Sequence, residues 1–210
     1  LFAHALGVNR AWLIGHDRDV LTPEQTAAVE TLLNRRLAGE PVAYLLGERE
    51  FHGRPFRVTP DVLIPRPDTE LLVEEALARL PLGERLEVLD IGVGSGAIAI
   101  SLALERPGCG VTGVDLSEAA LGVARSNAET LGANVELLAS DGFAALAGRR
   151  FHLIASNPPY IATTDPHLAR GDLRFEPLQA LASGADGLDL IRRLVAQAPE
   201  HLVAGGWLLL

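Results

Sequence analysis

Lysine and methionine are both absent from this 210-residue chain, so all 18 of its basic side chains are arginine. The single cysteine, Cys109, excludes an intramolecular disulfide. The six histidines show no metal-ligand spacing with Cys109 or with one another, and we therefore expect no metal site. The formal net charge of −9 argues against direct binding of nucleic acid, because proteins that bind its phosphates usually present a basic face.

Long apolar runs are missing as well. The longest, AIAISLAL at residues 97–104, is far shorter than the roughly 20 residues that a transmembrane helix requires. The composition, 48% hydrophobic and 21% charged, is typical of a globular protein with one full domain and a smaller one. We expect a cytoplasmic protein without membrane contact. Because the sequence lacks an initiator methionine and stops at GGWLLL, inside an expected strand, we also expect both ends to be truncated.

The first part of the chain is predicted to be helical up to about Leu46. Thr22 stands three residues before Gln25, which is the spacing of a capping box at the start of a helix. Apolar residues then recur at helical spacing until Gly39 and Pro41 end the pattern.

A change of pattern follows. Residues 50–64 alternate strand-forming residues around Gly53, which predicts a β-hairpin. The stretch PRPDTE then predicts the start of a helix at Asp68 or Thr69.

From residue 86 onward, apolar strand-like runs alternate with helical patterns. This alternation indicates βαβ units, and hence a doubly wound, mostly parallel sheet with helices on both faces. Ligands bind such sheets at the carboxyl ends of the strands. We therefore expect four segments to converge on one crevice: DIGVGSG, VDLS, SDGF and SNPPY.

Glycines at positions 92, 94 and 96 separate the first parallel strand from its helix. They permit a tight turn and let backbone N–H groups approach an anionic ligand. Asp115, at the end of the next strand, suits ribose hydroxyls, so a nicotinamide dinucleotide also fits this loop. A purely structural turn is a further alternative.

The tetrapeptide NPPY distinguishes between these alternatives. It resembles the [Asn/Asp]-Pro-Pro-[aromatic] motif of S-adenosylmethionine-dependent methyltransferases that modify a planar nitrogen. The Asn157 side-chain oxygen and the Pro158 carbonyl are suited to accept hydrogen bonds from such a nitrogen. The prolines stiffen the segment, and Tyr160 offers a flat face to the substrate.

Most of the chain resembles the release factor glutamine methyltransferases, the HemK/PrmC family. The resemblance rests on VLDIGVGSGAIAISLA, SNPPYI, FEPLQALASGADGLDLIRRL and the long stretch that contains IPRPDTE. It implies an α/β protein with a class I, Rossmann-like methyltransferase domain, a small helical N-terminal domain and a linking β-hairpin. It also implies methyl transfer from S-adenosylmethionine, with S-adenosylhomocysteine as product. The acceptor would be the glutamine amide in the Gly-Gly-Gln motif of class I peptide chain release factors.

The resemblance also implies site residues. The expected cofactor-binding residues are Gly92, Val93, Gly94, Ser95, Gly96, Asp115, Asp141, Gly142 and Asn157. The expected substrate-binding residues are Asn157, Pro158, Pro159 and Tyr160, of which Asn157, Pro158 and Tyr160 are the catalytic candidates.

One position departs from the family pattern. Some members carry a tryptophan where this chain has Gly142, so packing against adenine would fall to Phe143 or to the backbone. Asp141 would accept from the adenine amine or cap a helix. Three residues of PRPDTE are secondary candidates for the same pocket, with helix capping or ion pairing as the alternative: Arg66, Thr69 and Glu70.

We expect three units: a helical substrate-recognition domain at 1–48, a linking hairpin at 49–66 and the methyltransferase domain at 67–210. The runner-up function is an adenine N6 methyltransferase acting on DNA or RNA, against which the acidic charge counts. A dinucleotide-dependent oxidoreductase or a non-catalytic release-factor-binding module would leave NPPY unexplained. We expect a monomer.

Overall fold

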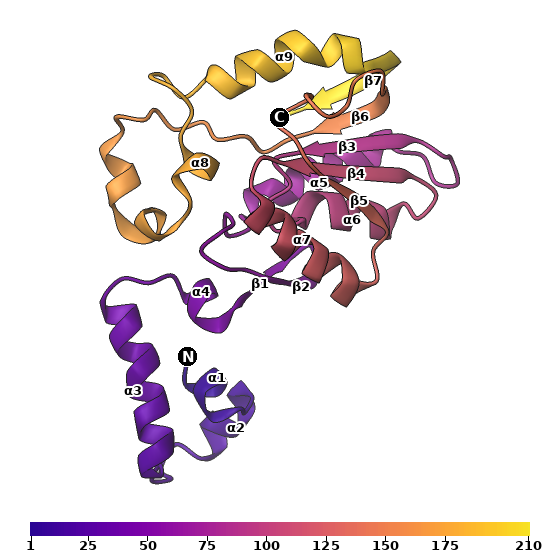
Figure 1. Ribbon diagram of the computed structural model, residues 1–210. Coiled ribbons are helices and arrows are strands. Elements are labelled where there is room, and N and C mark those ends of the chain that lie inside the picture. Colours follow the sequence, from indigo (N-terminus) through magenta and orange to yellow (C-terminus); the bar gives the residue numbers. More distant parts are fainter.

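The computed structural model describes all 210 residues, with the N-terminal helices set apart from a sheet that helices cover on both faces (Figure 1). Four helices precede the first strand: α1 (Phe2–Leu6), α2 (Arg10–Gly15), α3 (Pro23–Leu37) and α4 (Val42–Leu46). Helix α3 begins with the predicted capping box. Thr22 Oγ1 accepts from the N–H of Gln25 at 3.2 Å, and Gln25 Oε1 accepts from the N–H of Thr22 at 2.9 Å.

The expected β-hairpin is present but is shorter than predicted. Strands β1 (Glu48–Phe51) and β2 (Arg54–Arg57) pair antiparallel, and the chain after Arg57 runs without regular structure to residue 67. Three prolines in that stretch, at positions 60, 65 and 67, lack the N–H groups that a ladder requires. Phe51 and Phe56 of the hairpin are buried in the main core, with ring centroids 6.0 Å apart.

The main sheet has five parallel strands in the order β5-β4-β3-β6-β7. Its strands are β3 (Glu87–Ile91), β4 (Gly110–Asp115), β5 (Val135–Ala139), β6 (Phe151–Ala155) and β7 (Leu202–Leu209). The remaining helices are α5 (Asp68–Arg79), α6 (Ala97–Glu105), α7 (Glu118–Leu131), α8 (Leu178–Leu181) and α9 (Asp189–His201), with 3₁₀ turns η1 (Pro166–Ala169) and η2 (Gly171–Phe175). The predicted doubly wound parallel sheet is confirmed.

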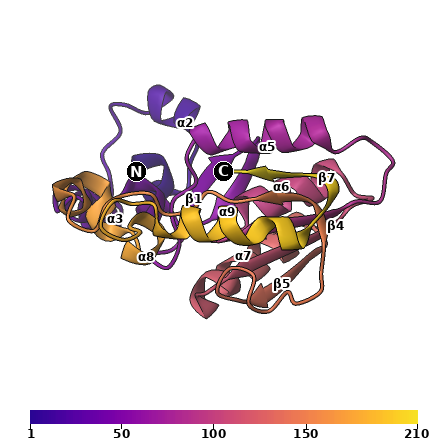
Figure 2. The same cartoon turned by 90° about the horizontal axis from the view of Figure 1, so that it is seen from above.

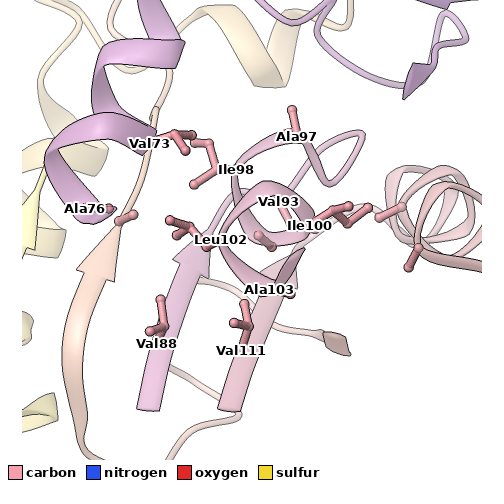
Figure 3. Close-up of a cluster of buried hydrophobic side chains, with 14 of the residues drawn as sticks. Val73, Ala76, Val88, Val93, Ala97, Ile98, Ile100, Leu102, Ala103 and Val111 are labelled. Carbon is pink, nitrogen blue, oxygen red and sulfur yellow. The ribbon is translucent and has the colours of Figure 1, made fainter. Parts of the chain in front are cut away.

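The two faces of the sheet bury separate apolar clusters, because neighbouring residues of a strand point to opposite faces. Val88 of β3 belongs to the larger cluster, which helices α5, α6 and α7 cover (Figure 3). Leu89, the next residue, belongs to the second cluster, which α9 covers through Leu194 and Ala198. Seen from above, β7 lies between α5 and α9 (Figure 2).

Polar contacts join the helical part to the sheet domain. Arg36, near the end of α3, forms an ion pair with Asp172 of η2 at 3.2 Å. Arg174 donates to the carbonyl of Ala38. The segment at 166–176 therefore contacts the N-terminal helices directly. None of the helices is long and apolar enough to cross a lipid bilayer.

Candidate active site

A cavity opens at the carboxyl ends of four adjacent strands, where the sequence predicted convergence. It is lined by residues that follow β3, β4, β5 and β6, among them Gly92, Gly94, Asp115, Leu116, Ser140, Asp141, Gly142, Asn157 and Pro159. Residues 61–63, from the stretch after the hairpin, form part of the same wall. Segments that lie far apart in the sequence thus surround one space.

The glycine loop between β3 and α6 has left-handed backbone at all three glycines, with φ of 77° at Gly92, 52° at Gly94 and 87° at Gly96. A Cβ at Gly96 would lie 2.5 Å from Cδ1 of Ile100, so packing as well as φ requires glycine there. A Cβ at Gly92 would meet no atom within 4 Å, since this residue borders the cavity.

The other two residues of the loop, Val93 and Ser95, do not line the main cavity. Val93 is buried in the larger core cluster, and Ser95 is buried beneath the loop. Both border a smaller hollow that Asn157 and Thr69 also line, not the main cavity. The carbonyl of Ser95 accepts from Nδ2 of Asn127 at 2.8 Å, which anchors the loop to α7.

Asp115 connects the end of β4 to the glycine loop. Its Oδ2 accepts from the N–H of Gly94 at 2.9 Å, and its Oδ1 accepts from the N–H of Ser117 at 2.9 Å. Each carboxylate oxygen retains a further lone pair, and Asp115 lines the cavity. Asp115 can therefore hold the loop in shape and still accept from ligand hydroxyls.

Asp90 is a buried carboxyl that the sequence did not single out. It lies in β3, is fully buried, and accepts from the N–H of Ala99 at 3.1 Å through Oδ2, while Oδ1 has no partner. Burial raises the pKa of Asp90 to about 7, the negative charge of Asp115 acts in the same direction, and the bond from Ala99 opposes them. The available signal was an acidic residue inside the otherwise apolar run VLDI.

The end of β5 carries an ion pair. Nη1 of Arg193, on α9, donates to Asp141 Oδ2 at 2.9 Å, and Nη2 donates to the other carboxylate oxygen. Gly142 follows with φ of 58°. Phe143 is not available to the cavity, because it is buried in the second cluster and stacks on His201 with ring centroids 4.4 Å apart. The expectation that Phe143 packs against adenine is therefore wrong.

Two hydrogen bonds hold Ser156, the residue that precedes the NPPY segment. Ser156 is buried, donates through Oγ to the carbonyl of Ile91 at 2.7 Å, and donates through N–H to the carbonyl of Leu209 at 3.0 Å. The next residue, Asn157, donates from Nδ2 to Thr69 Oγ1 at 3.2 Å. This bond turns the carbonyl oxygen of the same amide away from Thr69 and leaves it as an acceptor.

The rest of the segment lines hollows that Asn157 also lines. Pro158 and Tyr160 line two neighbouring hollows together with Asn157, and Pro159 borders the main cavity as well. Tyr160 is 63% exposed, so its ring is open to an incoming group.

Of the three secondary candidates, two lie next to Asn157 and one lies at the hairpin. Thr69 accepts a hydrogen bond from Asn157, and Arg66 lines three hollows that Asn157 also lines. Arg66 is paired with the buried carboxylate of Glu176, whose Oε2 accepts from the N–H of Ile64 at 3.1 Å. Glu70 instead accepts from the N–H of His52 at 3.1 Å and supports the hairpin turn, so it does not belong to the site.

Comparison with known proteins gives the family. Residues 1–47 match the PrmC N-terminal domain, and residues 67–171 match the methyltransferase small domain. The release factor glutamine methyltransferase of Bordetella pertussis is 56% identical over 207 residues, which cover 98% of this chain and 77% of that protein. This chain belongs to the release factor glutamine methyltransferase family. The Escherichia coli K12 member is 48% identical over 211 residues, covering 100% of this chain and 76% of the relative.

The family resemblance drawn from the sequence is confirmed, as is a methyltransferase that depends on S-adenosylmethionine. A solved structure supports the same fold and cofactor. It is the T. thermophilus 16S rRNA N2 G1207 methyltransferase in complex with AdoMet and guanosine, which is 26% identical with a TM-score of 0.56. The match covers 77% of this chain and 40% of that one.

Proposed function

We propose that this chain transfers a methyl group from S-adenosylmethionine to the side-chain amide nitrogen of the glutamine in the Gly-Gly-Gln motif of class I peptide chain release factors. Its family membership supports this assignment, since relatives matched over nearly all of the chain are release factor glutamine methyltransferases. The observation that carries it is the orientation of Asn157 beside the cavity.

Asn157 meets the chemical need of the reaction. An amide nitrogen is a poor nucleophile because its lone pair is delocalised into the carbonyl. Thr69 occupies the Nδ2 end of Asn157, so Oδ1 is free to accept one N–H of the substrate amide. We assign the second N–H to the Pro158 carbonyl. Two fixed acceptors orient the nitrogen and favour the positive charge that develops on it during transfer.

Tyr160 and the two prolines complete the acceptor side. The exposed ring of Tyr160 offers a flat surface to the planar carboxamide. Pro158 and Pro159 lack N–H donors and restrict φ, so the acceptors stay in place. No strong base is required, because the proton can leave the nitrogen after the new bond has formed.

The main cavity fits the donor. S-adenosylmethionine, when bound, supplies an electrophilic methyl group and leaves as S-adenosylhomocysteine. We assign the donor contacts to Gly92, Val93, Gly94, Ser95, Gly96, Asp115, Asp141, Gly142 and Asn157. Backbone N–H groups at the start of α6, where Ala97 and Ile98 line the smaller hollow beside the glycine loop, suit the carboxylate of its amino-acid tail. Asp115, in the main cavity, suits its ribose. Val93 and Ser95 act through the loop backbone, since their side chains face away from the main cavity.

We also assign a role to each of the three predicted units. Residues 1–48 serve in substrate recognition, 49–66 link the two domains, and 67–210 form the methyltransferase domain. The protein acts as a monomer in the cytoplasm and binds the release factor without direct contact to nucleic acid, in keeping with its net charge of −9. An adenine N6 methyltransferase is not favoured, because the matched relatives are named for glutamine methylation.

The decisive experiment compares acceptors. The protein is incubated with methyl-labelled S-adenosylmethionine and an unmodified class I release factor, its Gly-Gly-Glu variant, or duplex DNA. We expect label on the wild-type factor alone. Label on DNA would replace the proposal with the adenine reaction, and label on the Gly-Gly-Glu variant would show that the acceptor is another residue.

A further inference from the structure

Arg193 borders the proposed donor cavity, although the sequence motifs predicted no donor contact for it. It projects from α9 and borders the cavity together with Ser140, Asp141 and Gly142. Its guanidinium is fixed by two N–H bonds to the Asp141 carboxylate, one of them 2.9 Å long, although the side chain is 41% exposed. A long side chain held at two points loses less conformational freedom when a ligand arrives.

The guanidinium lies beside the position that a side chain at residue 142 would occupy. A Cβ built on Gly142 would lie 3.8 Å from Nη2 of Arg193, and no other atom outside residues 141–143 would lie within 4 Å of it. The backbone at Gly142 has φ of 58°, a conformation that disfavours other residues. Residue 142 therefore contributes only backbone, and Arg193 supplies the side-chain surface on that side.

The position of Arg193 along the cavity indicates which part of the donor lies next to it. Asn157 marks the acceptor end, the glycine loop receives the amino-acid tail, and Asp115 receives the ribose. The base then extends past Asp115 toward residues 140–142, where Phe143 is turned away into the core. This step rests on the proposed function, because it assumes that the donor lies in this cavity.

We propose that Arg193 determines the fit of the donor's adenine ring. Its planar guanidinium covers one side of the base above Gly142, a role suited to arginine because its flat cation stacks on aromatic rings. The ion pair also presents the Asp141 carboxylate, which retains free lone pairs, as an acceptor for an exocyclic amine. The pair thus selects a base that carries an amine and has an open ring face.

Calorimetric titration with two ligands tests the proposal. S-adenosylhomocysteine carries the amino-acid tail, whereas 5′-methylthioadenosine lacks it, so an effect on the base changes both affinities by the same factor. We expect Arg193→Ala to weaken both ligands about tenfold. Arg193→Lys should reduce both affinities nearly as much, since an ammonium group has no planar face.

Arg192→Ala is the matched control. Arg192 is the adjacent residue of α9, pairs with Asp186 at 2.6 Å and does not border the cavity. We expect this variant to bind both ligands as the wild type does. Equal affinities for Arg193→Ala and Arg192→Ala would overturn the inference, as would full retention by Arg193→Lys or a loss confined to S-adenosylhomocysteine.

Asp115→Ala distinguishes the role of Arg193 from the placement of the donor. If Asp115→Ala weakens both ligands and Arg193→Ala does not, the donor lies in this cavity and the role of Arg193 is wrong. If neither variant changes affinity, the placement of the donor itself is wrong. Thermal unfolding of each variant verifies that the protein remains folded.

Discussion

The side-chain nitrogen of Asn157 donates to the hydroxyl of Thr69 at 3.2 Å, although 88 positions of sequence separate the two residues. Thr69 belongs to the first turn of α5, and Asn157 directly follows Ser156 at the end of β6. The helix that begins with PRPDTE therefore sets the orientation of the amide in NPPY. We therefore expect Thr69 to act as a positioning residue for Asn157.

Replacement of Thr69 by valine keeps the shape of the side chain and removes the hydroxyl. The Asn157 amide would lose the bond that fixes its orientation, so we expect kcat to fall about tenfold, with S-adenosylhomocysteine affinity nearly unchanged. Thr69→Ser retains the hydroxyl and should recover most of the rate. Steady-state methyl transfer to the release factor measures the effect; equal rates for the two variants would argue against positioning.

Asn157→Ala removes the first of the two proposed acceptors. Because acceptor orientation acts mainly on the transition state, we expect methyl transfer to fall by ~100-fold or more while donor affinity stays nearly intact. Single-turnover transfer and calorimetric titration of the donor product separate these quantities. A parallel loss of donor binding would assign Asn157 to the donor site instead.

Asp115→Ala should have the reverse effect. It removes the acceptor for the N–H groups of Gly94 and Ser117 as well as the proposed ribose contact. We expect the dissociation constant of S-adenosylhomocysteine to rise by about 10- to 100-fold, with a smaller change in kcat at saturating donor. Glu118→Ala, at the largely exposed start of α7, is the control and should bind normally.

Asp90 predicts a dependence of stability on pH. Its pKa of about 7 in the folded protein lies above the ordinary carboxyl value of 3.8, so the folded state retains a proton that the unfolded chain releases between these values. The free energy of unfolding contributed by this group therefore falls as pH rises through that range and is lowest above about 7. The total change is on the order of 4 kcal/mol, at about 1.4 kcal/mol for each pH unit between the two pKa values.

Asp90→Asn removes this titration while keeping an oxygen that can accept from Ala99. Urea unfolding from about pH 5 to about pH 8 should show the wild type losing stability relative to the variant as pH rises. A constant difference between the two proteins across that range would contradict the pKa.

Alanine substitutions at Gly92 and Gly96 should differ in kind. Both positions have positive φ, so each substitution strains the backbone by about 1 to 3 kcal/mol. Only at Gly96 does the new Cβ meet Ile100, so Gly96→Ala should lose more stability in thermal unfolding. At Gly92 the Cβ projects into open space at the cavity, so Gly92→Ala should lose donor affinity out of proportion to its stability.

Local patterns were sufficient to predict the elements and their convergence. The alternation of strand-like and helical runs predicted the parallel sheet, and parallel strands place their following loops at one edge. The capping box at Thr22 and the start of α5 at Asp68 were also readable, because both depend on residues within one helical turn.

Features that depend on tertiary packing could not be predicted from the sequence. The pairs Arg66–Glu176 and Asp141–Arg193 join residues more than fifty positions apart, and no local spacing signals them. The orientation of Phe143 was also inaccessible, since either side of the β5 loop would accept an aromatic ring until the position of α9 is known. For the same reason the sequence showed the acid at position 90 but not its burial.

The strand order β5-β4-β3-β6-β7 places the loop after β6, which is proposed to hold the acceptor, beside the three loops after β3, β4 and β5 and not among them. In the proposed assignment the loops after β5, β4 and β3 contact the donor alone, whereas the loop after β6 contacts both donor and acceptor. Ser156, which precedes Asn157, donates to the carbonyl of Ile91. Pro158 and Tyr160 do not line the main cavity, so changes at these two positions would leave its wall intact. Such a layout lets acceptor choice diverge during evolution while the donor-binding half is inherited unchanged.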